Sequence, residues 1–542
     1  MKPYTLLLLC ALLGWSSCSR STYQVGVATT SLEPDEQAPS LTLAGYAGPA
    51  KGRFTLTWEP CEAEEVRFSA PMPIPSELAS LGVICYTESP THAYAVSADN
   101  TLLERKKGDL SAQWLRIGYP NGVSYTIEIA RLAWCENHLY ALTPDGKHFR
   151  SRHNSEGTLT ASALSIAQGR GQVVIVALDL CGVDYAFTKS VKAQIYSELG
   201  IPPESLLINC SHTHFAPVTQ EWRTWGEPAL RGDERYMEGV VRPAILRVVR
   251  EALSATKPAC IAFSRDTTHI GFNRSLGNEQ GGYDNGVDML RITPLDGSAE
   301  MLLFTTGCHP VKPDRRAGHF TLSANYPGVA RARLREAGFS DALFLQGTAG
   351  DINPRGGFVA TGEALAEDVL RGLKNGSHPL SGRVACRLDS IALPLSPISP
   401  DSLAAWRATR PMPNAAPLGG YENEIPVRDK RWAEIVERHY TEGTMPAEAW
   451  VYLQTVEVGE WRLVALSREV TTQYSRAIKE ALSPRPVSVV GYTSDVSSYL
   501  ATPAHMEAGR YEGEESFIWY GQPATLPEES FRRIVAHVVE KQ

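Results

Sequence analysis

The chain lacks the excess of basic residues that nucleic-acid-binding proteins carry. Its 542 residues include 60 acidic and 52 basic side chains, which gives a formal charge of −8 at pH 7. Because phosphate backbones are bound chiefly by clustered Lys and Arg, this balance argues against a nucleic-acid partner. The composition is that of a soluble globular protein, and the length suits one large domain with an insertion, or two domains.

Closely spaced cysteine pairs are also missing. The ten cysteines form no Cys-x-x-Cys motif, and their wide spacings argue against a zinc site built from cysteine alone. A chain of this length needs no disulfide framework to stabilise it. Any metal site must therefore be sought among histidines and carboxylates.

Beyond the N-terminus, no segment reaches the ~18 continuous apolar residues that a spanning helix requires. Residues 1–18 combine Lys2 with an apolar run from Thr5 to Leu13, which is typical of a secretory signal peptide. The small residues before Cys18 also fit bacterial lipoprotein processing, in which that cysteine is lipidated. We expect an exported protein that is periplasmic, secreted or an outer-membrane lipoprotein, and a lipidated Cys18 would hold it at a membrane surface.

Residues 50–156 are β-rich and contain an internal repeat. The segment HAYAVSADN, which begins at His92, recurs as HLYALTPDG, which begins at His138. Each copy predicts a strand, a tight turn and a strand, because Asp-Asn and Asp-Gly suit the positive φ angles of hairpin turns. We predict a small inserted β-meander, similar to propeller blades, that packs on the larger domain.

From Gly171 onward, apolar strands alternate with helices. Gln172–Leu180 and Leu206–Cys210 read as buried strands on either side of a helix at Thr188–Leu199, which makes a βαβ unit. Further strands are predicted at 301–306, 342–346, 462–466 and 487–490, and further helices at 326–337, 361–374 and 475–482. The stretch 396–423, rich in Pro, Ala and Gly, predicts a surface loop.

The predicted fold class is therefore α/β, with a mixed or parallel sheet and flanking helices. Residues 24–49 and 157–542 would form the larger domain, and 50–156 would be the insertion. In such folds the chemistry gathers beyond the carboxyl ends of strands.

Two histidines stand two residues apart in the segment NCSHTHFAP, just after the strand that ends at Cys210. Strand side chains repeat with a period of two, so we expect His212 and His214 to share one face. Imidazole is the commonest metal ligand among side chains, and a catalytic zinc needs three protein ligands and an open position. The pair alone is an incomplete site, and a hydrogen-bonded pair without a metal fits the same residues.

Other candidates follow other predicted strands. His309 comes after the strand that ends at Thr306, and Glu469 comes after the strand that ends near Leu466, so they can supply the missing ligands. Arg274, between the histidines in the sequence, could hold a substrate oxygen by paired hydrogen bonds.

These residues resemble those of the neutral, non-lysosomal ceramidases, zinc amidases that hydrolyse N-acylsphingosines. The likeness runs from about Val25 to the C-terminus, interrupted by the insertion. The matching motifs are Gly45-Tyr46-Ala47, the segment SHTHFAP from Ser211, Asn273-Arg274-Ser275, Arg-Glu-Val-Thr-Thr around Glu469, and Tyr499 with Tyr511 twelve residues later. The resemblance implies one zinc ion per chain, held by His212, His309, Glu469 and Tyr499.

The resemblance also implies roles around the metal. A zinc-activated water would attack an acyl carbon, since zinc lowers the pKa of its water from 15.7 towards ~7. His214, Arg274 and Tyr511 would stabilise the oxyanion or pass a proton to the leaving amine. Asp351 would support a ligand histidine. Asn353 stands where the family has a serine linked to catalysis, and an amide is no nucleophile.

Two alternatives to an amphipathic lipid substrate stay open. The same zinc site could act on a glycan or an N-acyl sugar, because the insertion carries Trp114, Tyr119, Trp134 and Tyr140, residue types that stack on sugar rings. The chain could instead be a surface lipoprotein whose insertion binds a partner and whose zinc site is a relict.

Overall fold

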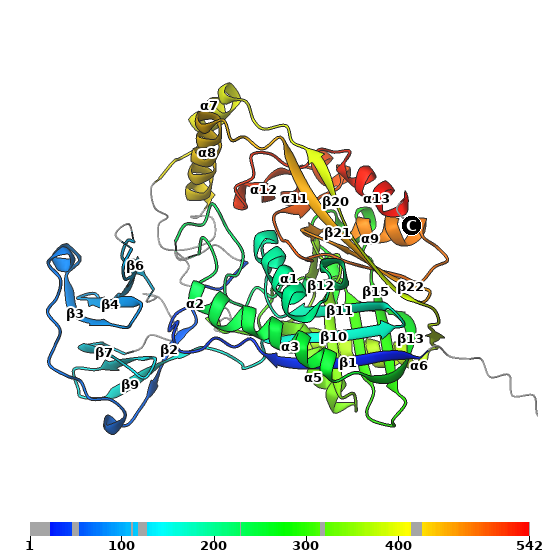
Figure 1. The fold of residues 1–542 in the computed structure, drawn as a ribbon. Helices are drawn as coiled ribbons and strands as arrows, with labels where there is room; N and C mark the ends of the chain where they lie inside the picture. Colours follow the sequence, from blue (N-terminus) through cyan, green and yellow to red (C-terminus); the bar gives the residue numbers. More distant parts are fainter. Residues whose placement is uncertain are drawn as a thin grey trace, which may run out of the picture.

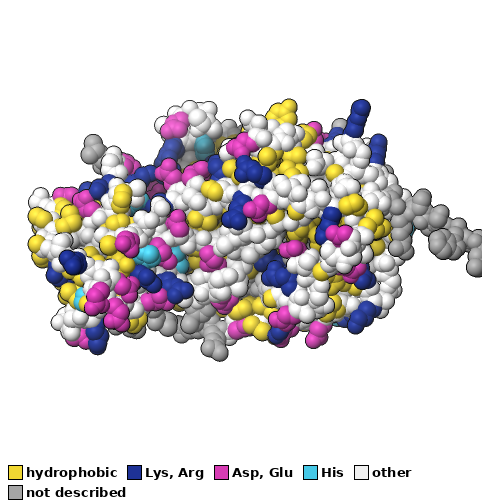
Figure 2. All heavy atoms as spheres, turned by 60° about the horizontal axis from the view of Figure 1, so that its bottom comes forward, with side chains coloured by type: hydrophobic (Ala, Val, Ile, Leu, Met, Phe, Trp, Pro, Cys, Tyr) yellow, Lys and Arg dark blue, Asp and Glu magenta, His cyan; other side chains and the backbone are white. Residues whose placement is uncertain are grey.

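The computed structural model of the chain describes residues 22–45, 54–109, 112–117, 127–227, 229–314, 320–413 and 425–540. The predicted leader with Cys18 lies outside these residues, as do Tyr46 and Tyr119. No helix within the described ranges is long and apolar enough to cross a membrane. Figure 2 shows acidic and basic side chains interspersed over one face of the molecule.

A nine-stranded mixed sheet forms the centre of the larger part of the molecule (Figure 1). Its order is β12-β11-β10-β1-β13-β15-β16-β17, with β19 paired beside β13. The pairs β11–β12 and β16–β17 are parallel, and the other neighbours on this path are antiparallel. The strands are β1 (Tyr23–Ser31), β10 (Thr160–Gln168), β11 (Gly171–Leu178), β12 (Leu206–Cys210), β13 (Lys257–Thr267), β15 (Gly286–Pro294), β16 (Met301–Thr306), β17 (Asp341–Gln346) and β19 (His378–Pro379).

A four-stranded sheet packs against one face of the nine-stranded sheet. Its strands, in spatial order, are β20 (Val384–Pro394), β21 (Glu448–Val458), β22 (Trp461–Leu466) and β24 (Val487–Val490). The strand β11 shows why two layers form. Its residues Val173 and Ile175 face the second sheet, and Val174 and Val176, which alternate with them, face the helices.

Helices cover the outer faces of both sheets. Helices α1 and α3 pack on one end of the large sheet, α5 and α6 pack on its other end, and α9 and α13 cover the smaller sheet. The α-helices are α1 (Tyr185–Leu199), α2 (Glu234–Tyr236), α3 (Arg242–Ser254), α4 (Gly277–Gln280), α5 (Asn325–Glu336), α6 (Phe358–Lys374), α7 (Pro400–Ala408), α8 (Ile425–Glu442), α9 (Thr472–Ala481), α10 (Pro503–Glu507), α11 (Tyr511–Glu514), α12 (Ser516–Trp519) and α13 (Ser530–Glu540). The predicted α/β class with a mixed sheet is confirmed.

The predicted loop over 396–423 is wrong in its first part, which contains helix α7. Ser399 caps this helix, because its hydroxyl accepts a hydrogen bond from the amide of Ser402. Pro400 follows at the first helical position, where its fixed φ angle is favourable. Proline disrupts a helix when it lies in the helix interior, but it is favourable in the first turn. Pro400 lies in the first turn, so it is compatible with helix α7. Residues 414–423 lie outside the described ranges.

The insertion consists of two four-stranded sheets beside the larger part (Figure 1). One contains β3 (Val83–Glu88), β4 (His92–Ser97), β5 (Leu102–Lys106) and β6 (Leu115–Arg116), and the other contains β2 (Leu56–Pro60), β9 (His148–His153), β8 (His138–Leu142) and β7 (Arg131–Cys135). Each sheet holds one copy of the repeat as its β4–β5 or β8–β9 hairpin, which is the strand, turn and strand that the sequence predicts.

Two tryptophans of the insertion pack within it. Trp134 stacks on Tyr94 with ring centroids 5.7 Å apart. Trp114 lies edge-on to Tyr86, and the guanidinium of Arg105 covers its ring. These contacts give both tryptophans a structural role in the insertion.

A buried ion cluster joins the insertion to the larger part. Arg235 of α2 donates hydrogen bonds to Glu104 of β5 at 2.9 Å and to Asp233 at 2.6 Å. A second ion pair joins Lys106 to Glu234 at 2.8 Å. The insertion is therefore held by charge pairs at α2.

Candidate metal centre

The loop after β12 contains His212 and His214. The strand ends at Cys210, and His212 has a φ angle of +63°, in the left-handed region. The sequence predicts that both rings share one face because they continue a strand, and this reason is wrong, since the strand ends before them. The turn nevertheless brings the two rings together edge-on, with their Nε2 atoms 3.2 Å apart.

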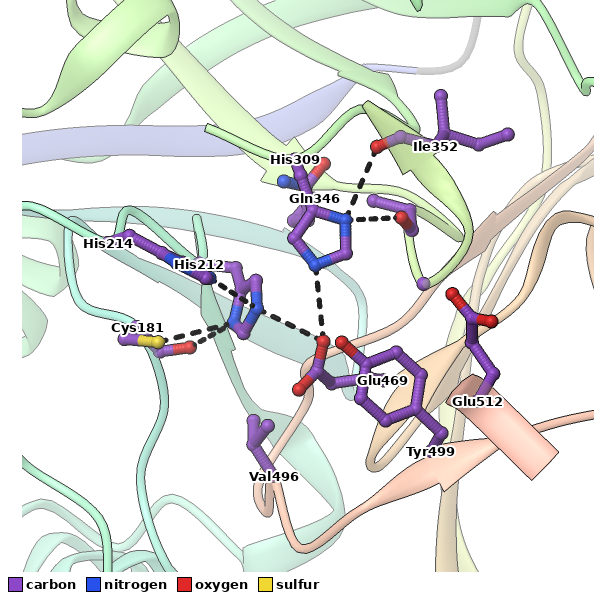
Figure 3. Close-up of polar contacts among 12 residues, drawn as sticks. Cys181, His212, His214, His309, Gln346, Ile352, Glu469, Val496, Tyr499 and Glu512 are labelled. Atoms are coloured by element: carbon purple, nitrogen blue, oxygen red, sulfur yellow. Dashed lines mark hydrogen bonds and ion pairs between the residues drawn. The ribbon is translucent and has the colours of Figure 1, made fainter. Parts of the chain in front are cut away.

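Two histidines and one carboxylate converge from different strands (Figure 3). The Nε2 atoms of His212 and His309 each lie 3.2 Å from the same atom, Oε2 of Glu469. All three side chains are at least 97% buried. Their ligand atoms lie within 4.8 Å of one another. The three residues therefore form a compact donor set.

The outer nitrogens of the histidines fix how the rings are protonated. Nδ1 of His212 lies 2.6 Å from the carbonyl oxygen of Cys181, and Nδ1 of His309 lies 2.6 Å from that of Ala349. A carbonyl oxygen only accepts hydrogen bonds, so each Nδ1 carries a hydrogen. The Nε2 lone pair of His309 then faces the carboxylate of Glu469. Burial would lower the pKa of His212, but Cys181 and Glu469 outweigh it and raise that pKa to about 10. These neighbouring nitrogen and oxygen lone pairs would be stabilised by a cation between them. Nitrogen and oxygen ligands of this kind suit zinc.

The charges of the group are consistent with a cation site. Burial would raise the pKa of Glu469, but His212 and His309 outweigh it and hold that pKa well below its usual range. Burial and then Arg274 lower the pKa of His309 to about 4. The other oxygen of Glu469 accepts a hydrogen bond from the hydroxyl of Tyr520. Glu469 is thus charged and His309 neutral at pH 7.

Tyr499 lies beside this group, as the sequence predicts. It is on β25 (Tyr499–Leu500), which pairs with β23 (Glu469–Val470) so that Tyr499 stands opposite Glu469. Its ring points toward the Glu469 carboxylate in Figure 3. Its phenol oxygen accepts a hydrogen bond of 3.2 Å from Arg274. Burial and then the charge of Glu469 hold the pKa of Tyr499 well above its usual range, and the guanidinium of Arg274 offsets them only in part.

Arg274 is held on all three of its nitrogens. Its Nε donates to Glu512 at 3.1 Å, one terminal nitrogen donates to Asn353 at 3.2 Å, and the other donates to the carbonyl of Gly350 at 2.9 Å. The sequence predicts paired hydrogen bonds from this residue to a substrate oxygen. The structure gives these contacts to the protein, so Arg274 chiefly supports Tyr499.

Asp351 lies further from the ligand histidines than the sequence predicts. Its carboxylate accepts hydrogen bonds from the amide of Thr472 at 2.8 Å and from Nδ2 of Asn273 at 2.7 Å, and it lies 3.5 Å from Nε2 of His505. The main chain around it contacts His309 instead, through the carbonyls of Ala349 and Ile352. Through these hydrogen bonds Asp351 stabilises the loop that orients His309.

His214 contacts His212, and Tyr511 contacts Tyr499. An added Cβ at Gly45, whose φ angle is +81°, would come within 2.2 Å of the His214 ring, so a glycine is needed for this contact. Tyr511 is 37% exposed, and its ring lies edge-on to Tyr499 at 5.6 Å. Tyr511 therefore connects the buried group with solvent.

Three neighbours of the site were not predicted from the sequence. Tyr492 packs its ring against His212 with centroids 4.3 Å apart, Tyr520 bonds Glu469, and His505 faces Asp351. Tyr492 follows the end of β24, so the rule of strand ends points to it, but the sequence assigns it no role. His505 and Tyr520 lie near short helices that carry no comparable signal.

Comparison with solved structures identifies the architecture. The neutral ceramidase from Pseudomonas aeruginosa matches with a TM-score of 0.54 and 18% identity, over 71% of this chain and 69% of that one. The chain has the fold of a neutral ceramidase. A second structure, a ceramidase complexed with C2, matches a similar share, 70% and 69%, with a TM-score of 0.53 and 15% identity. No family model and no curated protein matches the sequence.

Proposed function

We propose that the chain is a zinc-dependent hydrolase that cleaves the amide bond of an N-acyl lipid. The observation that carries this proposal is the convergence of two histidine Nε2 atoms on one carboxylate oxygen, each at 3.2 Å. Similarity to neutral ceramidases in fold supports the reaction class.

The residues that would hold the ion are His212, His309, Glu469 and Tyr499. When bound, zinc supplies a water that is acidic enough to ionise near neutral pH and polarises the acyl carbonyl. The chain orients these ligands. The carbonyls of Cys181 and Ala349 fix the rings of the two histidines, and Tyr520 fixes the carboxylate.

Other side chains would handle protons and the substrate. His214 has its Nε2 beside the group, 3.2 Å from Nε2 of His212, where it can accept a proton or give one to the leaving amine. Tyr511, at the exposed edge, is placed to contact an entering substrate. Asn353 accepts a hydrogen bond from Arg274 and so supports the Tyr499 side of the site. No nucleophilic serine is needed at that position.

We also infer that the protein is exported through the leader at residues 1–18, and that residues 50–156 are a separable insertion. An exported enzyme, free or attached through Cys18, could reach lipids outside the cytoplasm. Both inferences rest on the sequence patterns described above.

The proposal is tested with purified protein and a panel of N-acyl compounds. Fatty-acid release from N-acylsphingosines and N-acyl amino alcohols is measured before and after chelation, and after zinc is restored, beside N-acyl sugars. We expect cleavage of the lipid amides, loss on chelation, recovery with zinc, and loss in His212→Ala. Cleavage that persists without metal, or cleavage confined to the sugars, would contradict the proposal in its reaction or in its substrate.

A further inference from the structure

Exposed apolar side chains gather on one stretch of the insertion. Of the ten large hydrophobic side chains that are exposed in the described part of the chain, four lie within residues 72–84. They are Met72, Ile74, Leu81 and Ile84, each 40–49% exposed. Figure 1 draws this stretch along the edge of the insertion that faces away from the larger part (blue, left). Single exposed hydrophobic residues are ordinary, but a cluster of them marks a surface that contacts another body.

The core of the insertion holds this outer stretch, residues 68–85, in place. A short 3-10 helix runs from Ser76 to Leu81 and leads into β3. Leu78 of this helix is fully buried against the sheet of β3, β4 and β5. A bulge in β3 lies between Val83 and Cys85, so Ile84 has no partner on β4 and stands in solvent. The apolar side chains are therefore presented outward by an ordered segment.

The charges that contact the outer stretch are positive in excess. Glu77 is the one charged residue among its eighteen, and it pairs with Arg105 at 3.5 Å. Arg131 reaches the beginning of the stretch, where it donates to the carbonyl of Ser69 and lies over the ring of Phe68. Neither of these contacts neutralises the charge of Arg131. A positive charge beside exposed apolar side chains matches a membrane surface, where anionic headgroups lie directly above the acyl chains.

The backbone of the outer stretch also suits the boundary between water and lipid. Pro71, Pro73 and Pro75 carry no N–H, so three donors that would lose water at the boundary are missing. The amide of Leu78 donates to the carbonyl of Pro75 at 2.9 Å, within the stretch itself. Unpaired backbone groups are the main cost of placing a chain against lipid, and these features lower that cost.

The small size of the apolar strip favours a lipid surface over a protein partner. A stable protein interface buries about 800 Å² on each partner, and four side chains that are each less than half exposed offer far less. We propose that the outer stretch docks the protein on a phospholipid bilayer. Its four apolar side chains enter the boundary between headgroups and acyl chains, and Arg131 lies against anionic headgroups. This docking goes beyond the proposed hydrolase function and would bring the protein to the surface in which N-acyl lipids reside.

Sedimentation with vesicles that contain no amide lipid tests the docking separately from the reaction. The vesicles are phosphatidylcholine alone, or phosphatidylcholine and phosphatidylglycerol in equal parts. All proteins begin at Ser19, so that neither the proposed leader nor an acyl chain on Cys18 contributes. A double variant, Ile74→Asn with Leu81→Asn, removes two exposed apolar side chains without adding charge. Leu295→Asn is the matched control, because Leu295 is 58% exposed on the larger part.

We expect the wild type to bind both kinds of vesicle, and to bind the mixed vesicles more tightly at low salt than at high salt. The double variant should bind both kinds about tenfold or more weakly, because burial of apolar side chains drives the insertion. Arg131→Gln should weaken binding to the mixed vesicles alone. Leu295→Asn should bind as the wild type does.

A wild type that binds neither kind of vesicle would overturn the docking, as would a double variant that binds as tightly as the wild type. Sedimentation equilibrium without vesicles covers the rival occupant, a second copy of the chain. If the wild type associates with itself, the double variant does not, and neither binds vesicles, the outer stretch is a protein contact and the proposal is wrong. Because the vesicles hold no amide substrate, failure of the proposed hydrolase function would leave all of these outcomes unchanged.

Discussion

Replacing Glu469 with Gln should weaken zinc binding far more than it changes the fold. The substitution preserves shape, and the amide oxygen can still accept the hydrogen bond of Tyr520. It removes the one negative charge of the His212, His309 and Glu469 donor set and places an amide where two Nε2 atoms converge at 3.2 Å. Loss of a partner in the outer shell of a metal site costs about 10- to 100-fold in affinity, so loss of this inner ligand should cost at least ~100-fold.

The size of the effect can be worked out by linkage. Zinc at about 1,000 times its Kd stabilises the wild type by ~4.1 kcal/mol. A 100-fold weaker variant at the same zinc concentration is at about ten times its Kd and gains only ~1.4 kcal/mol. The zinc-induced rise in Tm should therefore shrink to about a third of the wild-type value.

The assay is thermal unfolding of each protein with and without zinc, so that changes in the metal-free protein cancel. Glu104→Gln is the control, because Glu104 is also a buried carboxylate but lies at the interface of the insertion. It should keep the full zinc-induced shift even if its own Tm falls. An equal shift in Glu469→Gln and wild type would refute the assignment of Glu469 as a ligand.

Three further outcomes are expected. Asn353→Ala should keep activity within about tenfold and keep its zinc, because Asn353 contributes one hydrogen bond to Arg274; loss of all turnover would show that it takes part in the chemistry. Gly45→Ala should lower kcat at least about tenfold with zinc content unchanged, because its Cβ would meet the His214 ring at 2.2 Å, and full activity would contradict a role for His214. Lys192 is buried against the carbonyl of Pro203 and Oε1 of Gln454, and burial lowers its pKa to about 8. Between pH 8 and 10 the unfolded chain therefore binds more protons than the folded chain. The free energy of unfolding of the wild type rises by ~2–3 kcal/mol over this range. The stability of Lys192→Met relative to wild type should therefore be greatest below pH 8 and decline toward pH 10 in denaturant titrations; a constant difference would contradict the lowered pKa.

The local parts of the fold were predictable from the sequence. Leu206–Cys210 and Met301–Thr306 are mainly apolar runs, and the structure has strands at these bounds. The rule that chemistry gathers after the ends of strands made His212, His309 and Glu469 candidates, and the resemblance to the ceramidases joined them in one site. The repeat of the insertion was visible for a similar local reason, since Asp-Asn and Asp-Gly mark its hairpin turns.

The remainder depended on contacts between distant segments. The left-handed turn at His212 has no signal in the sequence, since histidine seldom adopts a φ angle of +63°. Tyr520 reaches Glu469 across 51 residues, and Glu512 reaches Arg274 across 238. These residues come from the short helices α11 and α12 or the turn after them, where no hydrophobic period indicates which side chain points inward.

The central claim is that His212, His309 and Glu469 hold one zinc ion. The measurement that tests it most directly is the metal content of the purified protein, determined by mass spectrometry for the wild type and for His309→Ala after equal exposure to zinc. We predict one zinc per chain in the wild type and a loss of that zinc in the variant. A folded wild-type protein that retains no zinc, or a His309→Ala variant that retains a full equivalent, would contradict the account.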